Sequence, residues 1–190
     1  MIQHVIAFAF VLVAVASPAP ARAESKPKLA VFKCELFDTS GSKDLKVQQE
    51  QAQRLNLVTQ VIKDDIDRRG VYTIVDTSRA NELDSPHARF AAEGLFRECP
   101  GCEAEVAAQL GADLSMGCLI QKVSNLILNI NYYIRDAKTE RLQAQYSAAI
   151  RGNTDQTWVR SALWLLKNRV FEDPAAKAER HQRMQGNWTP

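Results

Sequence analysis

The chain has 190 residues, and its 24 lysines and arginines nearly balance 22 aspartates and glutamates, for a formal net charge of +2. This balance provides no basic surface of the kind that binds nucleic acid, so a nucleic-acid partner is not expected. The length fits one domain once a targeting segment is removed.

The N-terminus has the features of a secretory signal. The apolar run Val5–Ala16 is shorter than the roughly 20 residues that a membrane-spanning helix needs. A Ser-Pro-Ala-Pro segment follows, and Ala21-Arg22-Ala23 places small residues where a signal peptidase cleaves. We therefore expect residues 1–23 to be a signal peptide cleaved between Ala23 and Glu24, although the first four residues lack lysine and arginine. An uncleaved anchor helix is the alternative. The mature chain, with no membrane span, is expected in the periplasm.

The first half of the mature chain predicts a strand, a helix and a second strand. Lys28–Leu36 is the first strand, followed by turn residues from Phe37 to Asp44. Val47–Arg69 has apolar residues every three or four positions and is followed by Gly70, which is typical of a helix and its C-terminal cap. Val71–Asp76 is the second strand. This order favours a parallel pair of strands.

The second half predicts one more helix, three strands and a final helix. A helix over Glu103–Leu110 precedes a strand over Leu114–Val123. Apolar and polar residues then alternate in two segments, which predicts an antiparallel hairpin of Asn125–Ile134 and Arg141–Arg151. The last helix is expected from Thr154 to Val170, capped by Asn153 with Gln156.

Together these elements predict an α/β fold with a mixed five-stranded sheet, in the order β-α-β-α-β-β-β-α, and helices packed on it. One domain is expected over residues 24–171, followed by a flexible, charged tail over 172–190.

Several segments resemble known families. The Leu-Ala-Val-Phe strand, the Tyr-Thr-Ile-Val-Asp strand and Leu110-Gly111-Ala112-Asp113 resemble the amino-terminal domain of TolB and the curli-export lipoprotein group. A closer resemblance, to a bacterial secreted family of unknown function, is carried by the segments 30–40, 99–103, 121–131 and 151–155. The resemblance implies a periplasmic module with a TolB-like fold, and it implies no activity.

The pair Cys99 and Cys102, in Cys-Pro-Gly-Cys, is the sharpest local motif. A thiol redox enzyme needs a low-pKa cysteine at a helix N-terminus and a second cysteine close by, and both conditions can be met here. However, no strand of a thioredoxin-like order and no aromatic residue come directly before the motif. A structural disulfide is favoured, because the expected compartment is oxidising.

The remaining cysteines, Cys34 and Cys118, fall on predicted strands. They can pair with each other if those strands are neighbours, or stay as buried thiols. A metal site built from the four cysteines is disfavoured, since only one close pair exists and oxidation competes with metal binding. No cofactor is expected.

Two groups of polar residues are candidates for binding. Asp38 and Thr39 follow the first strand, where α/β sheets often place ligand sites, although a simple turn is the plainer interpretation. One face of the predicted hairpin is rich in amides and uncharged, which suits a partner surface or an ordinary solvated sheet face. Its residues are Asn125, Asn129, Asn131 and Tyr133.

The leading functional hypothesis is an accessory protein of the cell envelope that binds another envelope or periplasmic protein. No complete set of catalytic residues is recognised in the sequence, and the mature chain retains only His87 and His181 as histidines. The alternatives are a thiol–disulfide oxidoreductase using Cys99 and Cys102, and a carrier of a small molecule or metal.

Overall fold

The computed structural model describes residues 25–41 and 43–186. The expected signal peptide and the cleavage site between Ala23 and Glu24 lie outside these residues. In chain order the elements are β1 (Lys28–Val31), β2 (Glu35–Asp38), α1 (Leu45–Arg69), β3 (Thr73–Val75), η1 (Thr77–Glu82), α2 (Ala88–Glu93), α3 (Cys102–Gln109), β4 (Leu114–Lys122), β5 (Leu128–Asp136), β6 (Leu142–Ile150), α4 (Asp155–Leu165), η2 (Leu166–Val170) and α5 (Pro174–Gly186).

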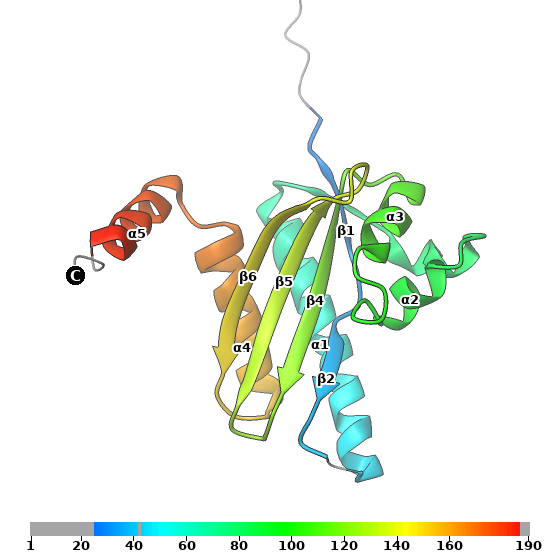
Figure 1. Cartoon of the computed structure of the whole chain (residues 1–190), viewed down its shortest axis with the longest axis vertical. Helices are drawn as coiled ribbons and strands as arrows, with labels where there is room; N and C mark the ends of the chain where they lie inside the picture. The colour runs from blue at the N-terminus through cyan, green and yellow to red at the C-terminus, as the bar shows by residue number, and fades with distance from the viewer. Residues whose placement is uncertain (1–24, 42, 187–190) are drawn as a thin grey trace, which may run out of the picture.

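The strands form one mixed sheet, shown in Figure 1, in the order β3-β1-β4-β5-β6, with β2 pairing to β4. β1 is parallel to both β3 and β4, and β2 is parallel to β4. The pairs β4–β5 and β5–β6 are antiparallel. The α/β class, the mixed sheet, the parallel first pair and the C-terminal hairpin are therefore confirmed.

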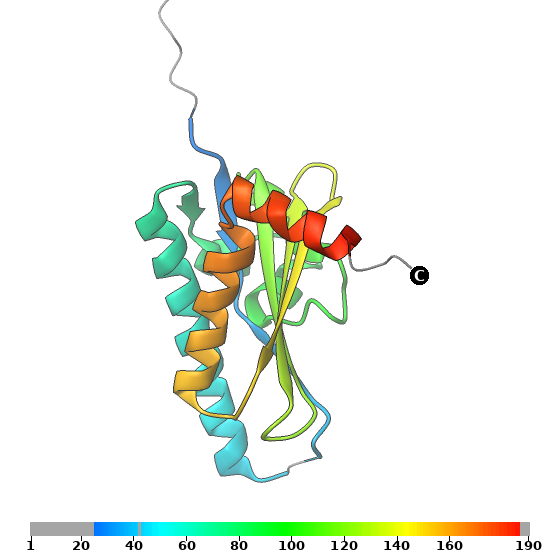
Figure 2. The same cartoon turned by 90° about the vertical axis from the view of Figure 1, so that its left-hand side faces the viewer.

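Helices α1 and α4 lie side by side on one face of the sheet (Figure 2). The apolar spacing of α1 buries Val58, Ile62 and Ile66 against the strands, and α4 adds Trp158 and Leu165 to the same core. Asp44 caps the N-terminus of α1 by accepting from the backbone N–H of Lys46, and Gly70 ends the helix with a φ of 64°, which favours glycine.

The opposite face of the sheet is covered only in part. A second, smaller core joins Ala30 and Phe32 of the first strand segment to Val106 and Ala107 of α3. Figure 1 shows α2 and α3 beside β1 and β4, while no helix among residues 25–41 and 43–186 lies over the same face of β5 and β6. The sheet therefore presents an uncovered surface on its C-terminal hairpin.

The sheet has six strands rather than the expected five, because the first predicted strand is divided into β1 and β2. Val31 pairs with Met116 and Glu35 with Leu119, so the first strand has one residue more than β4 over the same stretch. An extra residue interrupts the ladder in the manner of a β-bulge. β1 and β2 therefore lie end to end along β4, separated by residues 32–34.

Two boundaries in the C-terminal half differ from expectation. β5 begins at Leu128, because the Ser124 hydroxyl accepts from the N–H groups of Leu126 and Ile127 and holds a turn. Leu126 is consequently exposed and does not lie on the buried face of the hairpin. The N-cap of α4 is Thr154 rather than Asn153, and its hydroxyl is paired reciprocally with Thr157.

The segment expected as a flexible, charged tail contains helix α5. Its apolar content is low and it buries none of its residues, so periodicity gave no signal for it. Arg180 on this helix donates two hydrogen bonds to Glu172, which ties α5 to the segment before it. Among residues 25–41 and 43–186, no helix has both the length and the apolarity to cross a bilayer.

Candidate functional site

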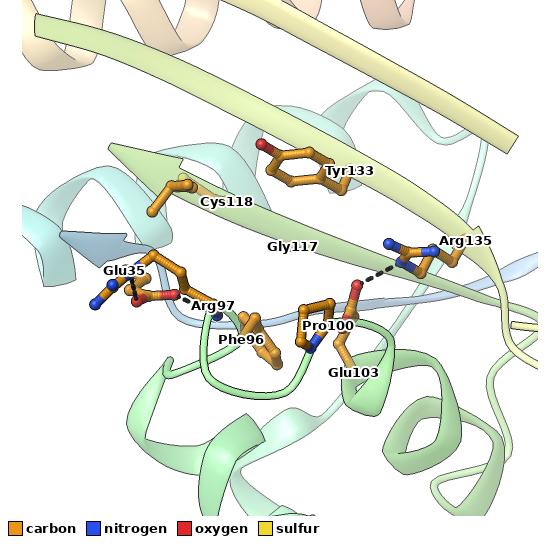
Figure 3. Close-up of a pocket in the computed structure, with 10 residues that line it drawn as sticks. Glu35, Phe96, Arg97, Pro100, Glu103, Gly117, Cys118, Tyr133 and Arg135 are labelled. Carbon is orange, nitrogen blue, oxygen red and sulfur yellow. Dashed lines mark hydrogen bonds and ion pairs between the residues drawn. The ribbon is translucent and has the colours of Figure 1, made fainter. Parts of the chain in front are cut away.

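A cavity of about 230 Å³ opens between β4, β5 and the loop before α3 (Figure 3). Tyr133, one of the predicted binding residues, forms part of its wall, and Gly117 lies between Tyr133 and the loop. The lining residues are Glu35, Phe96, Arg97, Pro100, Glu103, Gly117, Cys118, Leu119, Tyr133 and Arg135.

Two buried carboxylates hold the loop that forms one wall of this cavity. Glu35, 5% exposed, accepts hydrogen bonds from the backbone N–H and the guanidinium of Arg97. Glu103, 3% exposed, accepts from the N–H of Gly101 and from Arg135 at 2.9 Å. Buried carboxylates are stable only when paired in this way. Each ion pair therefore fixes one end of the loop to the sheet and leaves the cavity with a balanced charge.

The remaining wall is apolar or weakly polar. Phe96 packs edge to face on Phe32, and Pro100 and Leu119 add apolar surface. Burial raises the pKa of Tyr133, although the nearby Arg135 opposes this shift. The phenol is therefore neutral at physiological pH and can donate a hydrogen bond. The cavity suits an apolar side chain with a polar atom near Tyr133.

The uncovered sheet surface continues directly from the cavity. The pairing register places Gly117, Tyr133 and Gln145 in one row, and Leu119, Asn131 and Ser147 in the next. A third row contains Gln121 and Asn129. We call the polar residues of these rows the open face: Gln121, Asn129, Asn131, Tyr133, Gln145 and Ser147.

The six side chains of the open face are uncharged, although the row of Leu119 also contains Glu35 of β2, and the face is partly buried. Gln145 and Ser147 are exposed, while Asn131 is only 7% exposed and its amide donates to the carbonyl of Leu119. Because β5 is a central strand and β6 an edge strand, the face becomes more accessible toward β6.

The other predicted binding residues lie apart from the open face. Asn125 belongs to the turn before β5, where its side chain accepts from Asn153. Asp38 and Thr39 lie at the end of β2 and contact Lys122, the last residue of β4. A ligand-binding role for Asp38, Thr39 and Asn125 stays a prediction that these contacts do not support.

All four cysteines are paired. Cys34 and Cys118 join the end of the bulged segment to β4 across a sequence separation of 84 residues, which resolves the alternative left open by the sequence. Cys99 and Cys102 form the second disulfide, with Cys102 at the first position of α3. Cys102 is buried and Cys99 is only partly so. The second disulfide is therefore the more accessible one.

Sequence patterns did not identify the charged residues around the cavity. Glu35 lies in the first predicted strand, which also contains Lys33, and Glu103 follows Cys102, but a buried carboxylate looks like an exposed one in a single sequence. The partners Arg97 and Arg135 lie 62 and 32 residues away, so only the fold brings them together.

Several solved structures match the chain at low sequence identity and with TM-scores below 0.5. The LpoB C-terminal domain from Escherichia coli is 14% identical, with a TM-score of 0.45 over 65% of this chain and 82% of that chain. The PelC dodecamer from Paraburkholderia phytofirmans is 8% identical, with a TM-score of 0.44 over 74% and 85%. TolB from Acinetobacter baumannii is 11% identical, with a TM-score of 0.39 over 76% of this chain and 29% of that chain.

Sequence comparison identifies a family rather than a characterised relative. No curated protein matches the chain significantly. The model of the family DUF3280, described as "Protein of unknown function (DUF2380)", matches residues 27–170, which span nearly all of the sheet and the helices packed on it. This match confirms the resemblance to a family of unknown function: the chain belongs to the DUF3280 family.

Proposed function

We propose that this chain is an accessory protein of the cell envelope that binds another envelope protein through the open face and the adjoining cavity. The observation that carries the proposal is the position of Tyr133, which belongs to both surfaces. Uncharged polar side chains beside a cavity whose charged residues are paired with each other resemble a protein interface in which one partner side chain fills a pocket.

The chemistry of the site favours binding over catalysis. The two arginines and two glutamates around the cavity are paired with each other, so their charges stabilise the loop. The amides and hydroxyls of the open face can donate to and accept from the peptide groups of a partner. We infer a partner segment that places one apolar side chain in the cavity and its backbone along the rows toward β6.

The same proposal includes an oxidising compartment outside the cytoplasm. The expected signal peptide directs the chain out of the cytoplasm, and two disulfides among four cysteines fit an oxidising compartment.

Site-specific photo-crosslinking in cells tests this function. A photoreactive amino acid at Gln145, exposed on the open face, is expected to capture a discrete partner. The same amino acid at Gln53, an exposed glutamine of α1 on the other side of the sheet, is the matched control. Equal capture from both positions, or none from Gln145, would contradict a docking role for the open face.

Replacing Gly117 with alanine is expected to lower crosslinking from Gln145 about tenfold while leaving the fold intact. A Cβ at this position meets no atom closer than 3.9 Å, and alanine is slightly favoured over glycine inside a strand. The added methyl group instead occupies the cavity, and overfilling a packed contact costs on the order of 1–3 kcal/mol.

The control for this prediction is Gly186→Ala, a change of the same size on α5 in open space. It should alter neither crosslinking nor the melting temperature. Undiminished capture by the Gly117→Ala chain would show that the partner does not enter the cavity.

A further inference from the structure

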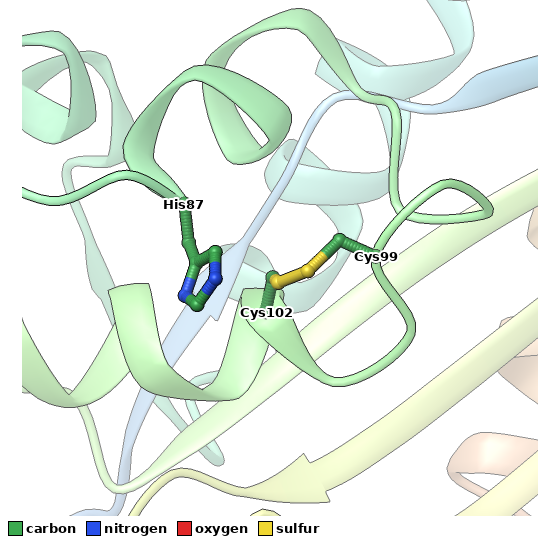
Figure 4. Close-up of side chains that lie close together, drawn as sticks. All are labelled: His87, Cys99 and Cys102. Carbon is green, nitrogen blue, oxygen red and sulfur yellow. A yellow bond between two sulfur atoms is a disulfide. The ribbon is translucent and has the colours of Figure 1, made fainter.

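A histidine lies against the Cys99–Cys102 disulfide, although it is distant in sequence. The ligand atoms of His87, Cys99 and Cys102 all lie within 4.8 Å of one another. Figure 4 shows the imidazole of His87, from the segment just before α2, facing the two sulfur atoms at the start of α3. The fold thus brings one nitrogen and two sulfur ligands to one point.

A carboxylate orients this histidine. Nδ1 of His87 is hydrogen-bonded to Glu105, and Glu105 is held in turn by Ser85 and Gln109. With Nδ1 engaged, Nε2 is the ring nitrogen left to face the sulfurs (Figure 4). A carboxylate–histidine pair of this kind is the usual outer support of a metal-binding imidazole, because it fixes the ring and the tautomer.

We propose that His87, Cys99 and Cys102 bind a thiophilic d¹⁰ metal ion, Zn²⁺ or Cu⁺, when the disulfide is reduced, with Glu105 as the positioning residue. Two thiolates and an imidazole suit either ion. Metal–ligand distances of about 2.0–2.3 Å place neighbouring ligand atoms roughly 3.5–3.8 Å apart. Reduction frees the two sulfur atoms to move apart to this separation, and the imidazole nitrogen, within 4.8 Å of them, then has to approach them.

The opening of the site is a balanced two-electron step. A dithiol reductant supplies two electrons and two protons, which break the Cys99–Cys102 bond, and is itself converted to a disulfide. The metal ion then displaces the thiol protons and binds the thiolates. Oxidation of the pair removes both sulfur ligands, so metal affinity follows the redox state.

The difference in burial between the two disulfides decides which one is reduced first. Cys34 and Cys118 are both almost wholly buried, whereas Cys99 is partly exposed. Exchange requires approach of a thiolate to sulfur, so the Cys99–Cys102 bond is attacked first while the other stays closed.

The test uses the untagged mature chain, reduced with a phosphine under anaerobic conditions and then desalted. Alkylation and mass spectrometry should find Cys99 and Cys102 modified and the other two cysteines protected. Zn²⁺ is then titrated by calorimetry, and Cu⁺ by competition with a chromophoric chelator. We expect saturable 1:1 binding of at least one ion to the reduced chain and none to the oxidised chain.

Variants separate this site from adventitious binding. His87→Ala should weaken affinity at least tenfold and Glu105→Gln about tenfold, the range seen for loss of a supporting carboxylate. His181→Ala, which removes an exposed histidine of α5, should leave affinity unchanged. Circular dichroism checks that each variant is folded. The proposal is overturned if the reduced chain binds neither ion, if the oxidised chain binds equally well, or if His87→Ala has no effect.

Discussion

Replacing Cys34 and Cys118 together with alanine is expected to lower the free energy of unfolding by about 4–5 kcal/mol at 25 °C. The disulfide closes a chain segment with a sequence separation of 84 residues. In the chain-entropy model, a cross-link over a loop of this length lowers the conformational entropy of the unfolded state. This raises the free energy of the unfolded state by roughly the same amount. A domain whose free energy of unfolding is about 5–15 kcal/mol would lose a large part of its stability.

The second disulfide supplies the matched control. Cys99→Ala/Cys102→Ala changes the same number of cysteines but opens a loop with a sequence separation of 3, for which the same model gives only about 2 kcal/mol. Chemical denaturation of both double variants measures the difference directly. If the two lose equal stability, the long loop is not the source of the effect.

Some elements of the fold have a local sequence pattern, whereas the division of the first strand beside the Cys34–Cys118 disulfide has none. Helical spacing predicted α1 and alternation predicted the β5–β6 hairpin, because each has one apolar face that the chain must bury. The division of the first strand had no such signal, since an extra residue changes the ladder without changing composition. Cys34 is the last residue of that interruption and is joined to Cys118 of β4.

The predicted binding surface is likewise marked by a local sequence pattern only in part. The amide-rich face was recognised on β5 because Asn129, Asn131 and Tyr133 alternate with buried apolar residues. Its extension to Gln145 and Ser147 required the strand register, and the cavity required Glu35 and Glu103 to meet arginines far along the chain. Such long-range pairs depend on the completed fold, so no local pattern marks them.

A third long-range pair is an ion pair that joins the ends of two neighbouring strands. The Lys122 side chain at the end of β4 is 1% exposed, and its ammonium donates to Asp38 at 2.7 Å and to Ser40 at 3.1 Å. Asp38 also accepts from the backbone N–H of Ser40 and from Gln51 of α1. The carboxylate therefore links β2, β4 and the first helix.

Asp38→Asn is expected to cost about 3 kcal/mol of unfolding free energy. The substitution keeps the shape of the side chain but leaves the buried Lys122 ammonium without a counter-charge, and breaking a buried pair in this way costs roughly 3–5 kcal/mol. Ser40 still accepts one hydrogen bond from Lys122, so we expect a loss at the lower end of this range. Adding Lys122→Met should restore most of the loss, because no unpaired charge then remains. Additive losses in the double variant would contradict this explanation.

The same pair makes stability sensitive to acid. Burial alone would raise the pKa of Asp38, but hydrogen bonds from Lys122, Ser40 and Gln51 outweigh it and lower the pKa to about 2. The unfolded value is about 3.9, so the folded state binds the proton more weakly. The stabilisation is therefore fully present above about pH 4 and is lost as the pH falls through about 2. Unfolding measured between pH 2 and 7 should show wild type and Asp38→Asn converging toward acid, since protonation and the amide both remove the charge. A difference that stays constant over this range would show that the charge of Asp38 does not stabilise the fold.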